Sequence, residues 1–205
     1  MIMTPERTGP KLKQVILTLL FVTSLAGVLL LQAYGPLRAS AGGPSDNRET
    51  WRVWAGIEIF PSYIAADQSL KGKVGDDGKI HLLIIYRRDK NRALEMADTL
   101  NRLEKIKNYP VSAEVLMEKD FTENVYNHVA GAYISERISD LPAFLVKASK
   151  SRILLFSPFE EDVEKGVPAG LYITDRITPY LNLTAMKRFN IDLKSFFVRI
   201  SEIYD

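Results

Sequence analysis

Apolar residues follow two patterns between positions 49 and 205, short continuous runs and helical stripes. Ile80–Tyr86 (IHLLIIY) and Arg152–Phe156 (RILLF) are short apolar runs, which are typical of buried strands. Residues 92–107 carry apolar side chains at steps of three and four, which predicts an amphipathic helix with one buried stripe. The stripe consists of Ala93, Met96, Ala97, Leu100, Leu103 and Ile106.

The remaining segments predict further elements of both kinds. Helices are expected over 49–66, 122–129, 141–148, 184–189 and 192–203, and strands over 111–117, 132–135, 170–174 and 178–183. Strands and helices therefore alternate, which favours parallel pairing with right-handed crossovers. We expect a three-layer α/β/α domain with a mainly parallel central sheet, in which the last two strands form an antiparallel hairpin.

The first forty residues have a different character. No charge lies between Lys13 and Arg38, and Val15–Leu31 is almost wholly apolar. Basic residues before this run and the small residues Ala39–Ala41 after it are typical of a secretory signal. The run is also long enough for an uncleaved signal anchor. Both alternatives place the residues after 42 in the periplasm, either free or anchored to the inner membrane.

This pattern divides the chain into a signal peptide or signal anchor over 1–41, a linker over 42–48 and a single domain over 49–205. The chain has 205 residues, of which 46% are apolar and 25% charged, so the domain can bury a core. The net charge is +2, but 42–205 contain 23 basic and 24 acidic residues, a charge of −1. This balance argues against nucleic-acid binding, and only the N-terminal segment suggests membrane contact.

The sequence offers little catalytic chemistry. Cysteine is absent, which excludes disulfides, thiol catalysis and cysteine-ligated metals. His81 and His128 lack partners at a ligand spacing, and no nucleophile-elbow motif is present. The glycine-rich residues 72–78 read as a turn, because no helix and no Ser or Thr follow at phosphate-loop spacing. We therefore expect a non-enzymatic protein without a cofactor or metal.

Two loops are candidates for binding. The first follows the strand at 80–86 and opens a helix, where an α/β sheet usually places its ligands. Its candidate residues are Arg87, Arg88, Lys90 and Arg92. The alternative is a solvated loop without a ligand. The second loop, Ser157–Asp162, could present its carboxylates to a basic partner, or Ser157 could cap a local turn.

Residues 132–200 resemble the YfiR-like (HmsC-like) periplasmic domain family. The resemblance lies in an ordered set of features: Tyr133–Glu136 as a short strand ending in Ser and Glu, Leu141–Leu145 as a Leu-Pro helix, Ile153–Phe156 as the next strand, Gly166 and Gly170 before a hairpin, and Tyr180–Leu183 with Ala185, Ile191, Leu193 and Ser195 as the closing pattern. Before residue 130 the likeness is weaker, since Arg87–Lys90 replace the family's Gly-Asp loop and the cysteines frequent in relatives are missing.

This resemblance implies an exported, non-enzymatic regulator. Such a domain binds the periplasmic part of an inner-membrane signalling protein, such as a diguanylate cyclase or a sensor kinase, and restrains it. Ser135 and Glu136 join the basic loop as candidate binding residues, and a homodimer is a further partner to consider. The alternative function is a small-ligand module that binds an anion for transport or sensing.

Overall fold

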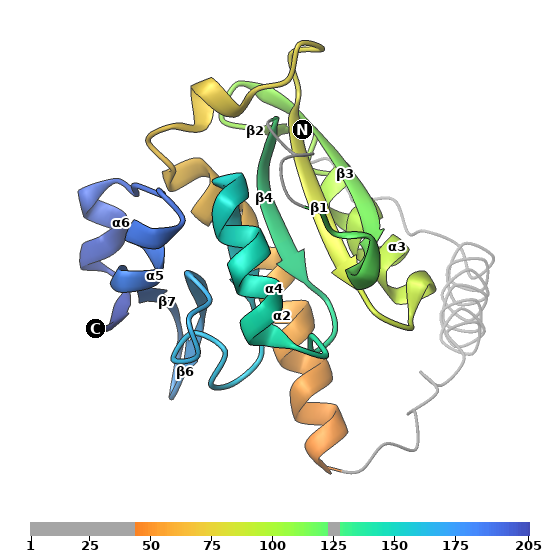
Figure 1. Cartoon of the computed structure of the whole chain (residues 1–205), viewed down its shortest axis with the longest axis vertical. Helices are drawn as coiled ribbons and strands as arrows, with labels where there is room; N and C mark the ends of the chain where they lie inside the picture. Colours follow the sequence, from red (N-terminus) through yellow and green to blue (C-terminus); the bar gives the residue numbers. More distant parts are fainter. Residues whose placement is uncertain (1–43, 123–127) are drawn as a thin grey trace, which may run out of the picture. The chain divides into compact units, whose positions relative to one another are not determined.

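The computed structural model describes residues 44–122 and 128–205 (Figure 1). The predicted signal or anchor segment lies outside these residues. Helix α2 spans Pro44–Ala66 and contains Pro61 in its interior. The expected linker over 42–48 is therefore wrong for its last five residues, which belong to this helix. No helix among the described residues combines the length and the hydrophobicity needed to cross a bilayer.

One mixed sheet of eight strands forms the centre of the fold, in the order β2-β3-β1-β4-β5-β6-β7-β8. The pairs β2/β3 and β6/β7 are antiparallel, and the other five are parallel. The predicted mainly parallel sheet with a C-terminal antiparallel hairpin is confirmed. The strands are β1 (Ile80–Tyr86), β2 (Lys105–Ile106), β3 (Tyr109–Met117), β4 (Val129–Ile134), β5 (Leu154–Ser157), β6 (Ala169–Ile173), β7 (Ile177–Asn182) and β8 (Glu202–Tyr204).

Helices cover both faces of this sheet. Helix α3 (Lys90–Asn101) connects β1 to β3, and α4 (Leu141–Ala148) leads from β4 towards β5 on the other side of β1. Right-handed crossovers in opposite directions place these two helices on opposite faces. Figure 1 shows α4 in front of the sheet, with α2 and α3 behind it. The order of connections therefore reverses between β1 and β4.

An aromatic cluster fixes α2 to the sheet. Phe60 and Tyr63 of α2 pack on Phe156 of β5, with ring centroids 5.6 and 5.0 Å apart. Tyr133 of β4 stacks on the same Phe156 ring at 5.3 Å. All four side chains are fully buried, so they form the centre of the core on the α2 face.

The helix predicted over 92–107 ends early. Helix α3 stops at Asn101, whose side-chain amide bonds the backbone N–H and C=O of Ala113 in β3 at 2.7 and 3.1 Å. Glu104 and Lys107 then adopt positive φ angles of 57° and 55°. These turns allow Lys105–Ile106 to pair with Tyr109–Pro110 as β2. The apolar Ile106 thus belongs to an edge strand instead of the helical stripe.

The helix predicted over 192–203 is also shorter in the structure. Helix α6 covers only Ser195–Arg199, and Glu202–Tyr204 form β8 beside β7. Half-buried Ile203 lies between exposed Glu202 and Tyr204, which is a strand pattern too short to detect in the sequence. Helix α5 (Leu183–Arg188) matches its prediction. Most of the helix predicted over 122–129 lies outside the described residues, and Val129 opens β4.

Candidate functional site

The carboxyl ends of β1, β4 and β5 carry the loops that the sequence singles out. In a doubly wound sheet, ligands bind outside these ends, at the point where the order of connections reverses. Here that point lies between β1 and β4. The loop after β1 contains Arg87–Asp89, and the residues after β4 include Ser135 and Glu136. The structure therefore brings together two candidate segments that are far apart in the sequence.

Glu136 occupies the amide groups of the β1 loop. Its Oε2 atom accepts the backbone N–H groups of Arg87, Arg88 and Asp89 at 2.8, 2.7 and 2.9 Å. Burial acts to raise the pKa of Glu136, but these bonds and the charge of Arg87 outweigh it, so the pKa is lowered. Ser135 supports this arrangement, since its N–H and Oγ both donate to Ile85 O at 2.9 Å.

The four basic candidates do not converge on one point. Arg88 and Lys90 are exposed, whereas Arg87 and Arg92 are partly buried. Arg92 lies on α3, and its charge lowers in part the pKa of Tyr133, which burial raises well above its ordinary value. Arg87 instead lines a pocket beside α4. The Nε atom of Arg87 and one terminal nitrogen of Arg92 are inaccessible to solvent and have no hydrogen-bond partner among the described residues.

The pocket beside Arg87, called here the Arg87 pocket, has a volume of about 260 Å³. It lies where β1, β3 and the first turns of α4 meet. Arg87, Lys119 and Lys147 supply positive charge, and none of these three side chains has an ion-pair partner among the described residues. The remaining lining residues are Met117, Glu118, Ser139, Asp140, Ala143 and Phe144.

Both carboxylates in the Arg87 pocket are engaged in local hydrogen bonds. Glu118 accepts the N–H of Ser139 at 2.9 Å and its Oγ–H at 3.1 Å. Asp140 caps α4 by accepting the N–H of Ala143 at 3.1 Å. The acidic groups therefore organise the loop before α4, and the basic groups remain available to a ligand.

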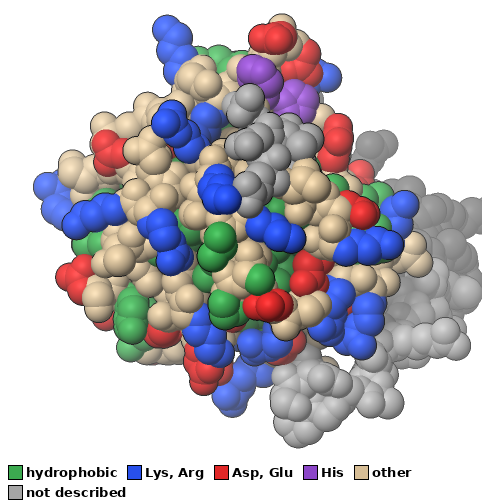
Figure 2. Space-filling view, in the orientation of Figure 1, with side chains coloured by type: hydrophobic (Ala, Val, Ile, Leu, Met, Phe, Trp, Pro, Cys, Tyr) green, Lys and Arg blue, Asp and Glu red, His purple; other side chains and the backbone are tan. Residues whose placement is uncertain are grey.

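The α4 face as a whole does not present one basic patch. Figure 2 shows Lys and Arg side chains spread across this face, with acidic and hydrophobic side chains between them. The Arg87 pocket therefore does not stand out by a high density of surface charge, and its distinguishing feature is the half-buried guanidinium of Arg87.

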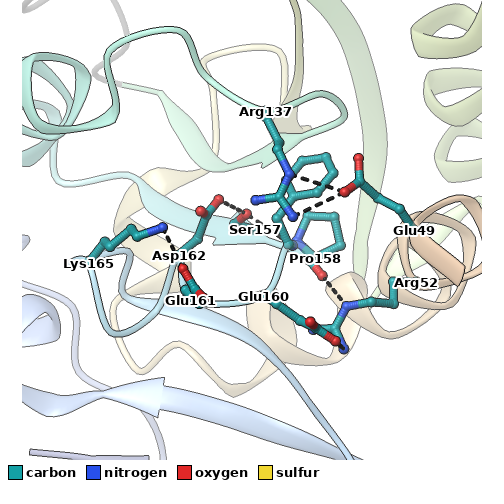
Figure 3. A network of polar contacts seen from close by, with 10 residues as sticks. Glu49, Arg52, Arg137, Ser157, Pro158, Glu160, Glu161, Asp162 and Lys165 are labelled. Carbon is teal, nitrogen blue, oxygen red and sulfur yellow. Dashed lines mark hydrogen bonds and ion pairs between the residues drawn. The ribbon is translucent and has the colours of Figure 1, made fainter. Parts of the chain in front are cut away.

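The acidic turn after β5 is paired within the chain (Figure 3). Glu160 contacts Arg52 at 3.3 Å, and Glu161 accepts from Lys165 at 2.8 Å. Ser157 donates to buried Asp162 at 2.5 Å, and its Oγ also accepts the N–H of Phe159 at 3.3 Å. Burial raises the pKa of Asp162, while the bond from Ser157 lowers it in part. Of the two interpretations of this loop, the structure therefore favours the one in which Ser157 caps a local turn over the one in which the carboxylates face a basic partner.

Arg52 and Arg137 hold this turn against the rest of the fold. Arg52 of α2 donates to the carbonyl oxygens of Pro158 at 2.8 Å and Leu171 at 3.2 Å. Figure 3 shows Arg137 reaching Glu49 from the other side of the turn, with nitrogen–oxygen distances of 3.1 and 3.0 Å. The guanidinium of Arg137 also lies 4.9 Å from the Phe159 ring centroid.

The two histidines lie away from these loops. The Nε2 atom of His81, at the start of β1, lies 3.1 Å from Asp77 Oδ1 in the preceding turn. His128 is exposed. The expected turn over 72–78 is present, since Gly75 N–H binds Lys79 O at 2.8 Å and Gly78 N–H binds Gly75 O at 2.9 Å. No cluster of metal-binding side chains occurs in residues 44–122 and 128–205.

Sequence reasoning missed several residues of this site. Lys119 and Lys147 each come from an element of ordinary composition, and neither stands near Arg87 in the sequence. The only sequence feature that could have indicated them is their position relative to predicted elements. Lys119 follows the end of β3, and Lys147 lies two helical turns after the Asp140 cap of α4. Arg52 was missed because it lies on an otherwise apolar helix, and its partners Pro158, Glu160 and Leu171 are more than 100 positions away in the sequence.

Comparisons with known proteins give a distant likeness in fold alone. No family model matches the sequence, and no curated protein matches it. The structure is similar to the ABC domain from Streptococcus pneumonia in complex with L-Trp, at a TM-score of 0.46 and 7% identity, over 75% of this chain and 60% of that one. It is also similar to a conserved domain protein from Vibrio cholerae O1 biovar El Tor, at a TM-score of 0.46 and 11% identity, over 67% of this chain and 58% of that one. The chain thus spans less than two thirds of each.

Proposed function

We propose that this chain is a binding module that takes a small anionic ligand in the Arg87 pocket. The observation that supports it is the half-buried guanidinium of Arg87, which lines the pocket and has no ion-pair partner among the described residues. A half-buried cation without a counter-charge costs free energy in the empty protein, and an anion bound beside the terminal nitrogens of Arg87 would offset part of that cost. Lys119 and Lys147 would attract the anion from the pocket rim.

Binding without turnover is the simplest activity for these residues. The pocket offers cations and hydrogen-bond donors, while Glu118 and Asp140 already accept hydrogen bonds from the chain. A general base needs a free acceptor within reach of the ligand. We therefore propose recognition of an anion as the role of the site, in transport or sensing.

Arg87 and Arg88 provide a matched pair of variants to test this. Both donate a backbone N–H to Glu136, but only the side chain of Arg87 lines the pocket. The full chain in a mild detergent would be titrated calorimetrically with acetate, phosphate, sulfate and aromatic carboxylates. We expect at least one anion to bind and to raise Tm, Arg87→Met to abolish binding, and Arg88→Met to retain it. Binding that survives Arg87→Met would refute the site.

A second candidate is the regulator that the family resemblance implies. The observation that favours it is a group of exposed apolar side chains on the hairpin β6/β7 and the segment that follows α6, which stand among polar and charged residues. Tyr172, Ile177, Ile200 and Tyr204 are 40%, 39%, 58% and 38% exposed, and the first three line a groove of about 800 Å³. Apolar groups gathered in this way are typical of protein interfaces. The occupant that we propose is the periplasmic part of an inner-membrane signalling protein.

This second candidate predicts a different mutational pattern. A Tyr172→Ser, Ile200→Ser double variant should lose crosslinking in the envelope to a membrane protein that carries a cyclase or kinase domain, identified by mass spectrometry. Arg87→Met should keep the crosslink. Loss of the crosslink in Arg87→Met alone would place the contact at the Arg87 pocket and reject this surface. A crosslink that persists in both variants would also reject it.

Both candidates place the domain outside the cytoplasm. The support is the charge-free run after Lys13 and the small residues Ala39–Ala41, which favour a signal peptide or a signal anchor. A fusion of alkaline phosphatase to the C-terminus should be active in cells. An inactive fusion, together with activity of a cytoplasmic reporter at the same position, would overturn the proposed export.

A further inference from the structure

We infer that the ligand of the Arg87 pocket is a small carboxylate with an apolar body, and that the pocket disfavours phosphate and sulfate. This inference rests on the proposed anion-binding function and narrows it to one chemical class. Two observations carry it: the chain's own carboxylates already occupy main-chain donors around the pocket, and apolar side chains line the pocket beside the cations.

The first observation concerns the loop after β1. Tetrahedral anions are commonly held by several backbone N–H groups that converge at a loop or a helix N-terminus. Three such groups, from Arg87, Arg88 and Asp89, do converge here, but Glu136 Oε2 accepts all three at 2.7–2.9 Å. A phosphate could use them only by displacing Glu136, whose lowered pKa keeps it charged and repulsive at neutral pH.

The start of α4 is occupied in the same way. The N–H of Ser139 binds Glu118 at 2.9 Å, and the N–H of Ala143 binds Asp140 at 3.1 Å. A tetrahedral dianion at this position would therefore meet two carboxylates and lose these N–H donors. A monoanion would feel less of this repulsion, since its charge is half as large.

The remaining donors suit a planar carboxylate. The Nε atom of Arg87 is buried, so the edge that a ligand can meet is the one formed by the two terminal nitrogens. This edge offers two parallel N–H groups at the spacing of two carboxylate oxygens. Lys119 and Lys147 add charge without fixed geometry. One guanidinium edge satisfies both oxygens of a carboxylate, whereas it leaves the other oxygens of phosphate or sulfate to the two flexible lysines.

The lining also contains an apolar part. Met117, Ala143 and Phe144 line the pocket next to the cations, and the Phe144 ring is fixed by Phe121 at a centroid distance of 4.8 Å. The volume of about 260 Å³ lies just below the usual range of ligand sites, so only a compact ligand fits. A compact molecule with a carboxylate at one end and a hydrocarbon or ring at the other would meet both halves of this lining.

Four probes separate the alternatives: 3-phenylpropionate, acetate, inorganic phosphate and 3-phenylpropanol, each titrated calorimetrically into the full chain. We expect 3-phenylpropionate to bind with a Kd at least about tenfold below those of acetate and phosphate, and 3-phenylpropanol not to bind. Arg87→Lys keeps the charge but removes the planar fork, so it should weaken 3-phenylpropionate about tenfold, while the matched Arg88→Lys variant should not.

The outcomes distinguish this inference from the proposed function. If phosphate binds as tightly as 3-phenylpropionate and loses affinity in Arg87→Met, anion binding stands and the carboxylate class is wrong. If acetate equals 3-phenylpropionate, the apolar half of the inference is wrong. If no anion in the wider panel binds, both the inference and the proposed function are rejected. Circular dichroism of each variant confirms that a loss of binding is not a loss of fold.

Discussion

Glu136 Oε2 lies 2.7 Å from the backbone nitrogen of Arg88, in the middle of three amide groups that it accepts together. The two residues are 48 positions apart and meet where the connections of the sheet reverse. Folds of this kind often bind a ligand's negative charge at such a point. In this chain an internal carboxylate satisfies the amides, and Arg87, Lys119 and Lys147 lie to one side, in the Arg87 pocket.

Glu136→Ala should destabilise the protein by about 1–3 kcal/mol, because three N–H groups lose a charged acceptor. Urea denaturation at pH 7 measures this change. Glu114→Ala is a suitable control, since Glu114 is an exposed residue of β3, and it should change the free energy of unfolding by less than about 0.5 kcal/mol. Equal effects of the two substitutions would show that the amide contacts contribute nothing to stability.

The contribution of Glu136 should also depend on pH. Its pKa is lowered in the folded state from the model-compound value of 4.5, so folding favours the charged form. The resulting stabilisation is complete above the unfolded pKa and is lost as pH falls through the folded pKa. The stability difference between the wild type and Glu136→Gln should therefore shrink between pH 7 and pH 3. A difference that stays constant over this range would contradict the lowered pKa.

Local sequence patterns predicted those elements whose determinants are local. The apolar runs predicted β1 and β5. Local residues also begin α3 and α4, since Asp89 and Asp140 cap them through the N–H groups of Arg92 and Ala143. Strands β2 and β8 were not predicted, because two or three residues carry too little pattern. They form only because a neighbouring strand offers an unpaired edge.

The candidate site was predictable only in part for the same reason. Arg87 and Glu136 could be selected separately, since each follows a strand. The contact between them could not be predicted, because it depends on β1 and β4 being neighbours in the sheet. Lys119 and Lys147 reach the Arg87 pocket from β3's end and from α4, so their role follows from tertiary packing and has no local signature.

Leu154→Ala tests the central position of β5. Leu154 is fully buried and pairs with Gly131 of β4, next to the α2 helix. The substitution should cost about 2–5 kcal/mol through lost burial and the cavity that remains. Denaturant titration measures this, with exposed Leu94→Ala of α3 as the comparison. A change below about 0.5 kcal/mol for Leu154→Ala would place the residue outside the core.

Asp162→Asn should stabilise the protein at neutral pH. Burial raises the pKa of Asp162 above the model-compound value of 3.8, so the folded state disfavours its charged form. This penalty is absent below the unfolded pKa and is complete above the folded pKa. Asparagine keeps an oxygen that can accept the Ser157 hydroxyl without carrying charge.

Each kcal/mol gained by Asp162→Asn would raise Tm by about 2–4 °C in a chain of this size. Differential scanning calorimetry at pH 7 and pH 3 should therefore show a higher Tm for the variant at pH 7 only. Asp76→Asn is the control, because it makes the same chemical change at an exposed residue of the turn over 72–78. A lower Tm for Asp162→Asn at pH 7 would mean that the hydrogen bond from Ser157 requires the charged carboxylate.

The close approach of α2 to the sheet depends on Gly56. A Cβ atom at this position would lie 2.6 Å from Tyr133 Oη, 3.1 Å from Pro158 Cβ and 3.2 Å from Phe156 Cε1. The Tyr133 hydroxyl is itself fixed, since it donates to Val53 O at 2.5 Å. Gly56→Ala should therefore destabilise by about 1–3 kcal/mol, although alanine is the better helix former by about 1 kcal/mol.

A double-mutant cycle with Tyr133→Phe separates this clash from other effects of Gly56→Ala. Removing the hydroxyl alone should cost about 1 kcal/mol, because the bond to Val53 is lost. In that background Gly56→Ala should cost at least about 1 kcal/mol less, since the nearest contact has gone. Gly72→Ala is the control, because a Cβ there meets no atom within 4 Å and should leave stability unchanged. Additive costs for the two substitutions would show that α2 lies farther from Tyr133 than these distances require.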